Sequence, residues 1–417
     1  MNRRTFLSRT AAATALLPLA GTFGSVAAEP MMAARASMWI YLWDLADEGY
    51  DTPLQRLKDH RLTSISLATA YHAGKFLAPH NPRRKVVFLE DGTVYFKPRE
   101  ELYGRITPAV NSMVGEGHSL ETARARAERH GLTTRSWVVC CHNTLIGTAH
   151  PGVTTRNAFG DRLLHNLCPS NGDVRAYLRA LVRDLSTRGI EVIELEAMQF
   201  QGYAHGFHHE REGIPLPTLV RFLLGFCFCD ACAARSREAG IDLETFRKYA
   251  AGTLSDYFAD PRPEESRFMS IDTLPAELFP NIQRWRRSVI TSLAAELMEA
   301  AGPDGPRLRP LVSADQGARI FSAVDPAGIA AATGGILIPG YIRDGMTLRG
   351  TLAPMLVMLT KSETTIGLQV GLPESGGKED FLGRMKACRE LGIDSYNFYN
   401  YGLIPLSYLE WIGEALQ

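Results

Sequence analysis

Short apolar runs alternate with longer segments of helical periodicity along most of the chain. Segments with amphipathic helical spacing include 174–188, 282–301 and 378–391, and Gly392 follows the last of them as a helix stop. The apolar runs predict eight strands, at 38–43, 64–70, 136–141, 191–197, 308–314, 335–339, 365–370 and 395–399. Eight strand–helix units in succession predict an α/β fold, a (β/α)8 TIM barrel over residues 36–417. A doubly wound sheet is the alternative, but no glycine fingerprint follows the first strand.

Two long segments interrupt this alternation and predict insertions. One covers about 73–106, after the second strand, and has the character of a small hairpin over the site. The other covers about 198–290, after the fourth strand, and carries Tyr203, His205 and His208. Loops of this length inside a domain are usually functional or disordered. The histidine and aromatic content favours a functional role.

Polar and aromatic side chains recur where the predicted strands end. In a barrel these carboxyl ends build the active site. For any one residue, a hydrogen-bonded rim position is the alternative, but recurrence around the barrel favours a binding site. The candidate substrate-binding residues are Asp44, Tyr71, His72, His142, Asn143, His205, His208, Tyr341, Gln369, Asn397 and Tyr399.

Two glutamates close the fourth predicted strand. Because side chains alternate along a strand, Glu194 and Glu196 point the same way, toward the barrel axis. Burial and close like charges raise the pKa of at least one carboxyl, as a general acid requires. Glu196 lies nearer the rim and is the candidate acid, whereas Glu194 is the candidate anchor of the layer beneath, through a salt bridge. Asp315 and Glu374, after strands five and seven, are candidates for the second catalytic carboxylate.

Four cysteines have the spacing of a metal site. Cys168 stands about sixty residues before Cys227, Cys229 and Cys232. Four thiolates that converge on one ion form a tetrahedral, structural zinc site with no open position for water. Disulfides and free core thiols are the alternatives, although seven cysteines cannot all pair within one chain. No organic cofactor is indicated, since no Walker loop is present.

The same region resembles a known family. The run Cys168-Pro-Ser-Asn-Gly-Asp-Val-Arg-Ala-Tyr, the strand that ends in Glu196, and Cys227-Phe-Cys229-Asp-Ala-Cys232 are similar to the zinc region of glycoside hydrolase family 42 β-galactosidases, over about residues 165–240. The resemblance implies zinc on the four cysteines and an acid/base role for Glu196. Leu195 stands where the related families place Asn, and Gln369 stands where a nucleophilic glutamate is expected. The chain therefore resembles more closely the uncharacterised bacterial barrels with a glycoside-hydrolase-like core.

These features favour a glycoside hydrolase that acts on a poly- or oligosaccharide. One alternative is a metal-dependent sugar isomerase or epimerase, whose ion would be held by Glu196, Asp315 and histidines such as His142 or His205. Another alternative is a non-catalytic carbohydrate-binding barrel that has lost its nucleophile. A homo-oligomer is compatible with all three.

Residues 1–28 have the pattern of an export signal. A basic start, Asn2-Arg3-Arg4, precedes an apolar run over 11–20 and small residues at Val26 and Ala28. The start resembles a twin-arginine signal, which implies the twin-arginine export machinery as a partner and a periplasmic or secreted location. An ordinary secretory signal is the alternative. Folding before export would allow zinc to load onto reduced thiols.

Charge and hydropathy narrow the range of partners. Lys plus Arg and Asp plus Glu both number 45, so the formal net charge is zero. Without a basic tract interleaved with aromatics, nucleic-acid binding has no support. After the signal, no apolar run reaches the roughly 20 residues of a membrane span. A carbohydrate is the expected partner.

Overall fold

The computed structural model describes residues 34–204, 207, 209–359 and 362–417. All of them belong to one unit, Ala34–Gln417. The predicted signal at 1–28 lies outside the described residues, as do His205 and His208.

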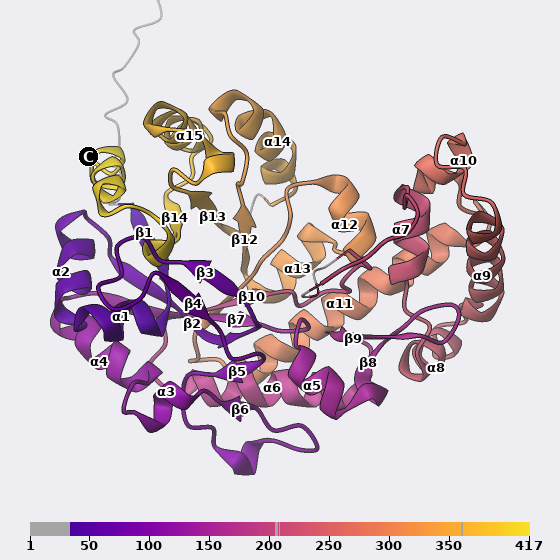
Figure 1. Ribbon diagram of the computed structural model, residues 1–417, viewed down its shortest axis with the longest axis horizontal. Helices are drawn as coiled ribbons and strands as arrows, with labels where there is room; N and C mark the ends of the chain where they lie inside the picture. Colours follow the sequence, from indigo (N-terminus) through magenta and orange to yellow (C-terminus); the bar gives the residue numbers. More distant parts are fainter. Residues whose placement is uncertain (1–33, 205–206, 208, 360–361) are drawn as a thin grey trace, which may run out of the picture. The chain divides into compact units, whose positions relative to one another are not determined.

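Eight parallel strands form the central sheet, in the order β11-β10-β7-β2-β1-β14-β13-β12 (Figure 1). A parallel bridge between Leu311 and Leu337 joins the two ends of this order, so the sheet nearly closes on itself. Each predicted strand overlaps one of the eight, and the predicted (β/α)8 barrel is confirmed. The strands are β1 (Arg35–Ile40), β2 (Ser64–Tyr71), β7 (Thr133–Val139), β10 (Val192–Glu196), β11 (Arg307–Pro310), β12 (Gly335–Pro339), β13 (Glu363–Gln369) and β14 (Ser395–Tyr399).

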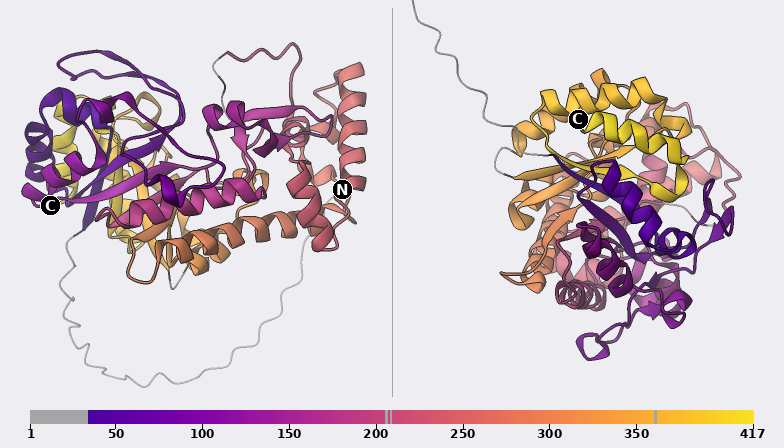
Figure 2. Two further views of the ribbon diagram at one scale, coloured as in Figure 1. Left: turned by 90° about the horizontal axis from the view of Figure 1, so that it is seen from below. Right: turned by 90° about the vertical axis from the view of Figure 1, so that its left-hand side faces the viewer.

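Helices cover the outside of the barrel (Figure 2). In α6, buried Val174, Leu178, Leu181 and Leu185 recur at helical spacing, and the Asn171 side chain caps the first turn. The amphipathic pattern therefore packs one face on the sheet. These helices are α2 (Asp51–Asp59), α4 (Leu120–Arg129), α6 (Gly172–Ser186), α11 (Phe279–Ala301), α13 (Pro326–Thr333), α14 (Gly345–Met358), α15 (Lys378–Glu390) and α16 (Leu409–Ala415).

Three strand–helix connections are long. After β2 the chain forms the antiparallel hairpin β3 (Lys75–Leu77) and β4 (Val86–Phe88), then β5 (Thr93–Val94), η1 (Glu100–Leu102), β6 (Ala109–Val110) and α3 (Ser112–Gly115). After β10 come α7 (Thr218–Gly225), α8 (Asp230–Glu238), α9 (Leu243–Ala259), α10 (Ser266–Met269) and η3 (Ile271–Thr273), and α11 leads back to the barrel (Figure 2). The third, after β7, was not expected from the sequence, and it contains α5 (Thr144–Ala149), η2 (Pro151–Val153), β8 (Thr154–Arg156) and β9 (Arg162–Leu167).

Two predicted strands end three or four residues earlier than expected. β1 stops at Ile40, and Asp44 belongs to α1 (Leu42–Glu48), whose first turn it caps by accepting a hydrogen bond from Tyr41 N at 3.0 Å. β11 stops at Pro310, and Asp315 caps α12 (Gln316–Ser322). In both cases apolar residues continue past the end of the strand, as Tyr41-Leu42-Trp43 and as Leu311-Val312, so hydrophobicity alone cannot locate the boundary.

A carboxylate lies at the centre of the barrel. Glu194 is fully buried, and its oxygens accept hydrogen bonds from Trp39 Nε1 at 2.8 Å, Ser66 Oγ at 2.7 Å and Asn397 Nδ2 at 2.8 and 2.9 Å. Arg135 Nη1 lies 3.8 Å from the same carboxylate. These partners come from β1, β2, β14 and β7, so one side chain joins β10 to four other strands.

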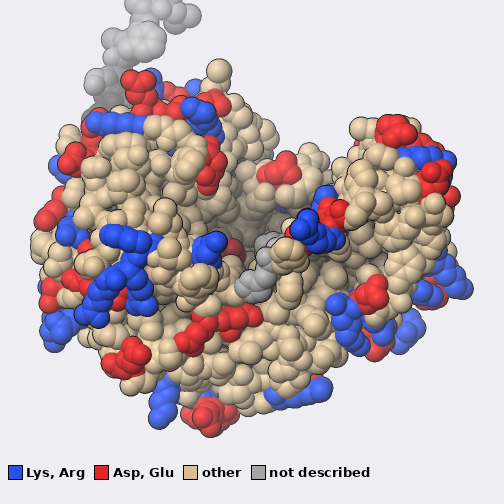
Figure 3. Space-filling model, viewed as in Figure 1, with Lys and Arg blue, Asp and Glu red and all other residues tan. Residues whose placement is uncertain are grey.

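On the face shown in Figure 3, a group of basic side chains lies to the left of the middle and a run of acidic side chains lies below the middle, with smaller mixed groups elsewhere. Within the described ranges, no helix is both long and apolar enough to cross a membrane.

Replacing Glu194 tests its role as the centre of the barrel. We expect Glu194→Ala to lower the free energy of unfolding by about 3–5 kcal/mol, because the substitution leaves the Arg135 guanidinium buried without its counter-charge. Exposed Glu238→Ala in α8 is the control and should change it by less than about 0.5 kcal/mol. Urea unfolding followed by circular dichroism measures both, and equal stability of the two variants would contradict this role.

Candidate active site

Glu196 ends β10 at the rim of the barrel. Its Oε2 accepts a hydrogen bond from Trp137 Nε1 of β7 at 2.6 Å, and its side chain is half-buried. The next residue, Ala197, has φ 53°, a left-handed conformation that a residue with a Cβ rarely adopts. Such strain persists where the surroundings enforce it, commonly at functional sites.

The surroundings of Glu196 favour its protonated form. Burial raises the pKa of Glu196 above its ordinary value, while the charge of His72 and the Trp137 N–H lower it in part. The carboxyl therefore holds its proton to a higher pH than an exposed glutamate does. A general acid needs this property near neutral pH.

Aromatic rings surround this carboxyl. The Trp137 ring lies 4.7 Å from Tyr71 and 6.1 Å from Tyr399, and Trp39 lies 5.7 Å from both Trp137 and Tyr399. Tyr341, which is 44% exposed, extends the group at 5.9 Å from Tyr399. Of these rings, Tyr341 and Tyr399 are not buried, and flat ring faces at a barrel mouth suit the apolar faces of sugars.

A glycine makes room for one of these rings. A Cβ on Gly367 of β13 would lie 2.7 Å from the Trp39 ring. The indole therefore fits across the barrel only because this position has no side chain.

Glu374 lies on the short helix η4 (Pro373–Ser375), beyond the end of β13. Gln369 Nε2 donates a hydrogen bond to Glu374 Oε1 at 3.1 Å. Burial raises the pKa of Tyr399, and the charges of both Glu196 and Glu374 raise it further. Tyr399 therefore lies within electrostatic range of the two carboxylates.

Arg384 of α15 fixes the loop that carries Glu374. Its guanidinium is fully buried and donates to Gln369 O at 2.7 Å and to Ser375 O at 2.6 Å. The same group donates to Ile342 O and Arg343 O, each at 3.2 Å, in the loop that follows Tyr341. One cation thus holds two loops at the barrel mouth.

The structure assigns structural contacts to several predicted site residues. Asn397 is committed to Glu194, so neither group faces the rim. The Asn143 amide caps α5 through Ile146 N at 2.8 Å and donates to Gly92 O at 3.2 Å. Asp315 is exposed and accepts from Ala318 N at 2.6 Å. Small polar residues after a strand commonly cap the next helix, and that local role applies here.

Asp44 is also buried and does not reach the surface of the barrel rim. It is 2% exposed, and a Cβ on Gly402 would lie 2.3 Å from its Oδ1, so the loop after β14 packs directly on the carboxyl. Burial raises the pKa of Asp44 to about 7. Asp44 is therefore a buried structural carboxyl and not the rim ligand expected from the sequence.

His72 and His142 follow β2 and β7 and lie together. Their rings stack with centroids 4.6 Å apart, and Tyr71 also stacks on His72, at 4.5 Å. Both imidazoles line a pocket of about 450 Å³.

Sequence reasoning missed Trp137, Tyr41 and Arg384. Tyr41 follows β1, and its hydroxyl donates to Tyr71 Oη at 3.3 Å. Trp137 pairs with Glu194 in the parallel register of β7 and β10. Because side chains alternate along a strand, the place of Trp137 in the third predicted strand was the signal that could have identified it. Arg384 gave no signal, because an arginine on a helix is usually exposed.

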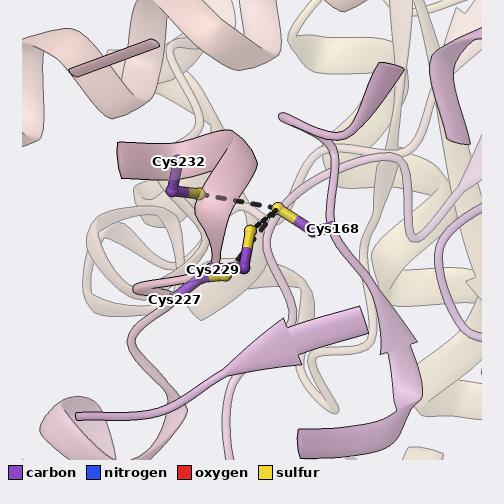
Figure 4. A group of neighbouring side chains, drawn as sticks. All are labelled: Cys168, Cys227, Cys229 and Cys232. Atoms are coloured by element: carbon purple, nitrogen blue, oxygen red, sulfur yellow. Dashed lines mark hydrogen bonds between the residues drawn. The ribbon is translucent and has the colours of Figure 1, made fainter. Parts of the chain in front are cut away.

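The four cysteines Cys168, Cys227, Cys229 and Cys232 form a buried cluster (Figure 4). The sulfurs of the last three lie 3.7, 3.5 and 3.5 Å from Cys168 Sγ. A disulfide requires about 2.05 Å. Four thiolates about 2.3 Å from one ion would lie about 3.8 Å apart, so the cluster could hold a metal ion.

The groups around the cluster suit an anionic centre. Cys232 Sγ lies 3.3 Å from Ser170 Oγ, and the buried Arg286 guanidinium interacts with the charges of Cys168, Cys227 and Cys232. Four thiolates on a divalent cation carry a net charge of about −2, which a nearby guanidinium offsets.

The isomerase alternative lacks a ligand set in the described part of the chain. Outside the four cysteines, the described residues contain no group of three His, Cys, Asp or Glu side chains arranged to hold an ion. Asp315, one expected ligand, caps α12 instead.

Comparison with known proteins shows the fold. No protein-family model matches the chain, and no curated protein does. The β-galactosidase of the haloarchaeon Halorubrum lacusprofundi is similar over 92% of this chain and 57% of its own, with 11% identity and a TM-score of 0.56. Those of the psychrophilic Marinomonas ef1 (8% identity, 92% and 59% covered) and Rahnella sp. R3 (12% identity, 93% and 56% covered) both give 0.53. At these identities the likeness shows the barrel alone, and the chain spans less than two thirds of each structure.

The buried Asp44 predicts a pH dependence of stability. Its folded pKa of about 7 lies above the unfolded value of about 3.9, so its contribution to stability is present at acid pH and is lost as the pH rises from about 4 to 7. Asp44→Asn keeps an acceptor for Tyr41 N and removes the titration. Relative to the unaltered chain, we expect this variant to gain roughly 4 kcal/mol of unfolding free energy between pH 4 and 8. Exposed Asp59→Asn is the control, and parallel pH profiles for all three proteins would contradict the placement of Asp44.

Proposed function

We propose that this protein is a glycoside hydrolase in which Glu196 is the general acid/base and Glu374 is the second carboxylate. The single observation that carries the proposal is Glu196 itself, a carboxyl with a raised pKa at the carboxyl end of a barrel strand, surrounded by aromatic rings. The matched structures with this fold include three β-galactosidases, which supports the same class of chemistry.

The two carboxyls divide the chemistry by their surroundings. Protonated Glu196 donates its proton to the glycosidic oxygen as the bond to the anomeric carbon breaks, and the leaving sugar departs as an alcohol. Glu374 is exposed, and its charge stabilises the developing positive charge on the sugar, either by bonding to the anomeric carbon or by activating water. Where Glu374 bonds to the anomeric carbon, Glu196 then acts as the base for the water that attacks that carbon. Tyr399 lies within range of both carboxylates, where the sugar ring would sit.

We also propose that the four cysteines bind one structural zinc. Cys168 precedes α6, whereas the other three lie before and within α8, so the ion would join the two segments that flank β10 in the chain. With all four positions taken by thiolates, zinc would supply stability and no chemistry at Glu196.

Export is proposed from the sequence of residues 1–28. The twin-arginine pattern supports passage of the folded chain through the twin-arginine machinery to the periplasm or the exterior.

The roles of the two carboxyls predict that only the loss of Glu196 depends on the leaving group. Glu196→Gln should lower kcat/KM about 10²–10⁴-fold on methyl glycosides, whose leaving alcohols need a proton, and far less on dinitrophenyl glycosides. Glu374→Gln should lower both strongly, because it removes charge stabilisation for either leaving group. A panel of α- and β-linked galactosides, glucosides, fucosides and xylosides provides the assay.

Exposed Glu379→Gln in α15 is the matched control and should leave both rates unchanged. Equal losses on both leaving groups in the Glu196 variant would contradict the acid role. Binding without turnover of any glycoside in the panel would instead indicate a carbohydrate-binding barrel.

The zinc proposal predicts about one zinc ion per folded chain. Cys229→Ser should lose the ion and lower the midpoint of thermal unfolding by several degrees, because the remaining thiolates bind zinc more weakly. Cys388→Ser, in α15, should retain it. Elemental analysis of the purified proteins measures the metal, and a full complement of zinc in the Cys229 variant would overturn the assignment.

A further inference from the structure

The pocket lined by His72 and His142 opens beside the proposed reaction centre. Tyr71 stacks on His72 at 4.5 Å and lies 4.7 Å from the Trp137 ring, whose N–H binds Glu196. The contacts that lead from His72 at the pocket to the Glu196 carboxyl therefore pass through two rings, those of Tyr71 and Trp137. Its volume of about 450 Å³ lies within the range of small-molecule sites.

One wall of this pocket comes from the β3–β4 hairpin. The inner face of the hairpin is packed, since Val87 is buried and Phe76 stacks on Tyr41 at 5.3 Å. The outer face is exposed and mostly apolar, with Phe88 at 75% and Leu77 at 66%, and it also carries Lys75. Phe88 and Lys75 are the members of this face that line the pocket. Exposed apolar groups of this kind commonly mark a binding surface.

The hairpin is held firmly enough to present that ring. Arg84 donates to both carboxylate oxygens of Asp47, at 2.7 and 3.0 Å, and Asn81 Nδ2 donates to Asp47 Oδ2 at 2.9 Å. His80 adds a contact to Glu48 at 3.2 Å. Two charged residues of α1 thus fix the connection between β3 and β4, and a bidentate arginine pair gives defined geometry.

The lining suits a neutral sugar better than an ion. Lys75 pairs with Phe88 in the hairpin register, and Asp91, of opposite charge, also lines the pocket. Their formal charges cancel, while the two imidazoles add hydrogen-bonding groups. An aromatic face beside donors and acceptors matches a pyranose ring, which has apolar faces and a hydroxyl edge.

We propose that this pocket is a second sugar subsite, so that the substrate is an oligosaccharide with one residue at Glu196 and a neighbouring residue stacked on Phe88. The position of the first residue rests on the proposed function. The binding of the second does not, since it depends only on the pocket.

Titration calorimetry on the full chain carrying Glu196→Gln tests this directly. The probes are galactotetraose, cellotetraose, xylotetraose, mannotetraose and chitotetraose, with the corresponding monosaccharides. We expect at least one tetrasaccharide to bind, and Phe88→Ala in the same background to weaken it at least about tenfold without changing monosaccharide affinity. Val86→Ala is the matched control, because Val86 is exposed on the same face and does not line the pocket.

Three results would overturn the subsite: no tetrasaccharide binds, Phe88→Ala binds as tightly as its parent, or Val86→Ala weakens binding equally. Failure of the proposed function is read separately, from hydrolysis of aryl monosaccharides by the unaltered chain. Phe88-dependent binding without hydrolysis would keep the subsite and refute the hydrolase, whereas hydrolysis with Phe88-independent binding would do the reverse.

Discussion

The buried Glu194 carboxylate is the interaction on which the rest of the barrel mouth depends. A charge in the barrel interior is costly unless donors surround it, and here Trp39, Asn397 and Arg135 do so from three other strands. Because side chains alternate along a strand, the residue two positions after each of these groups points to the same side of the sheet, and the position of its side chain is therefore set by the same strand. Those residues are Glu196 after Glu194, Tyr41 after Trp39, Trp137 after Arg135 and Tyr399 after Asn397. The candidate site is therefore the next layer above the central carboxylate.

A second constraint acts outside the barrel. The four-cysteine cluster joins the start of α6 to α8, and Arg175 of α6 extends the same packing by donating to Val289 O of α11 at 2.6 Å. The elements on both sides of β10 in the chain are thereby tied together, although none of these groups belongs to the layer of Glu196. The cluster and the layer of Glu196 can thus change independently, and a metal-binding pattern in a sequence is weak evidence for a particular reaction.

The sequence predicted the structure correctly where one local pattern determines it. All eight strands and the four-cysteine cluster follow from apolar runs and from thiol spacing, both of which are local signals. Asp44, Asn143 and Asp315 were assigned to the rim because they follow strands, yet each caps a helix or a helical turn. Choosing between a cap and a ligand requires the backbone geometry after the strand. Trp137 could have been found from the alternation of side chains along its strand, whereas Arg384 required the course of two loops, which no local pattern contains.

The position of Glu374, the proposed second carboxylate, also depends on the groups that hold it. The residue that ends β13 is Gln369, and its amide binds Glu374 on η4, so the carboxylate is carried by a loop and not by the strand. A carboxylate on a strand is aligned by the sheet, whereas one on a loop needs its own support. Arg384 supplies that support through Gln369 O and Ser375 O, and it also binds the loop after Tyr341. The geometry between the two carboxyls therefore depends on one buried guanidinium as much as on the barrel.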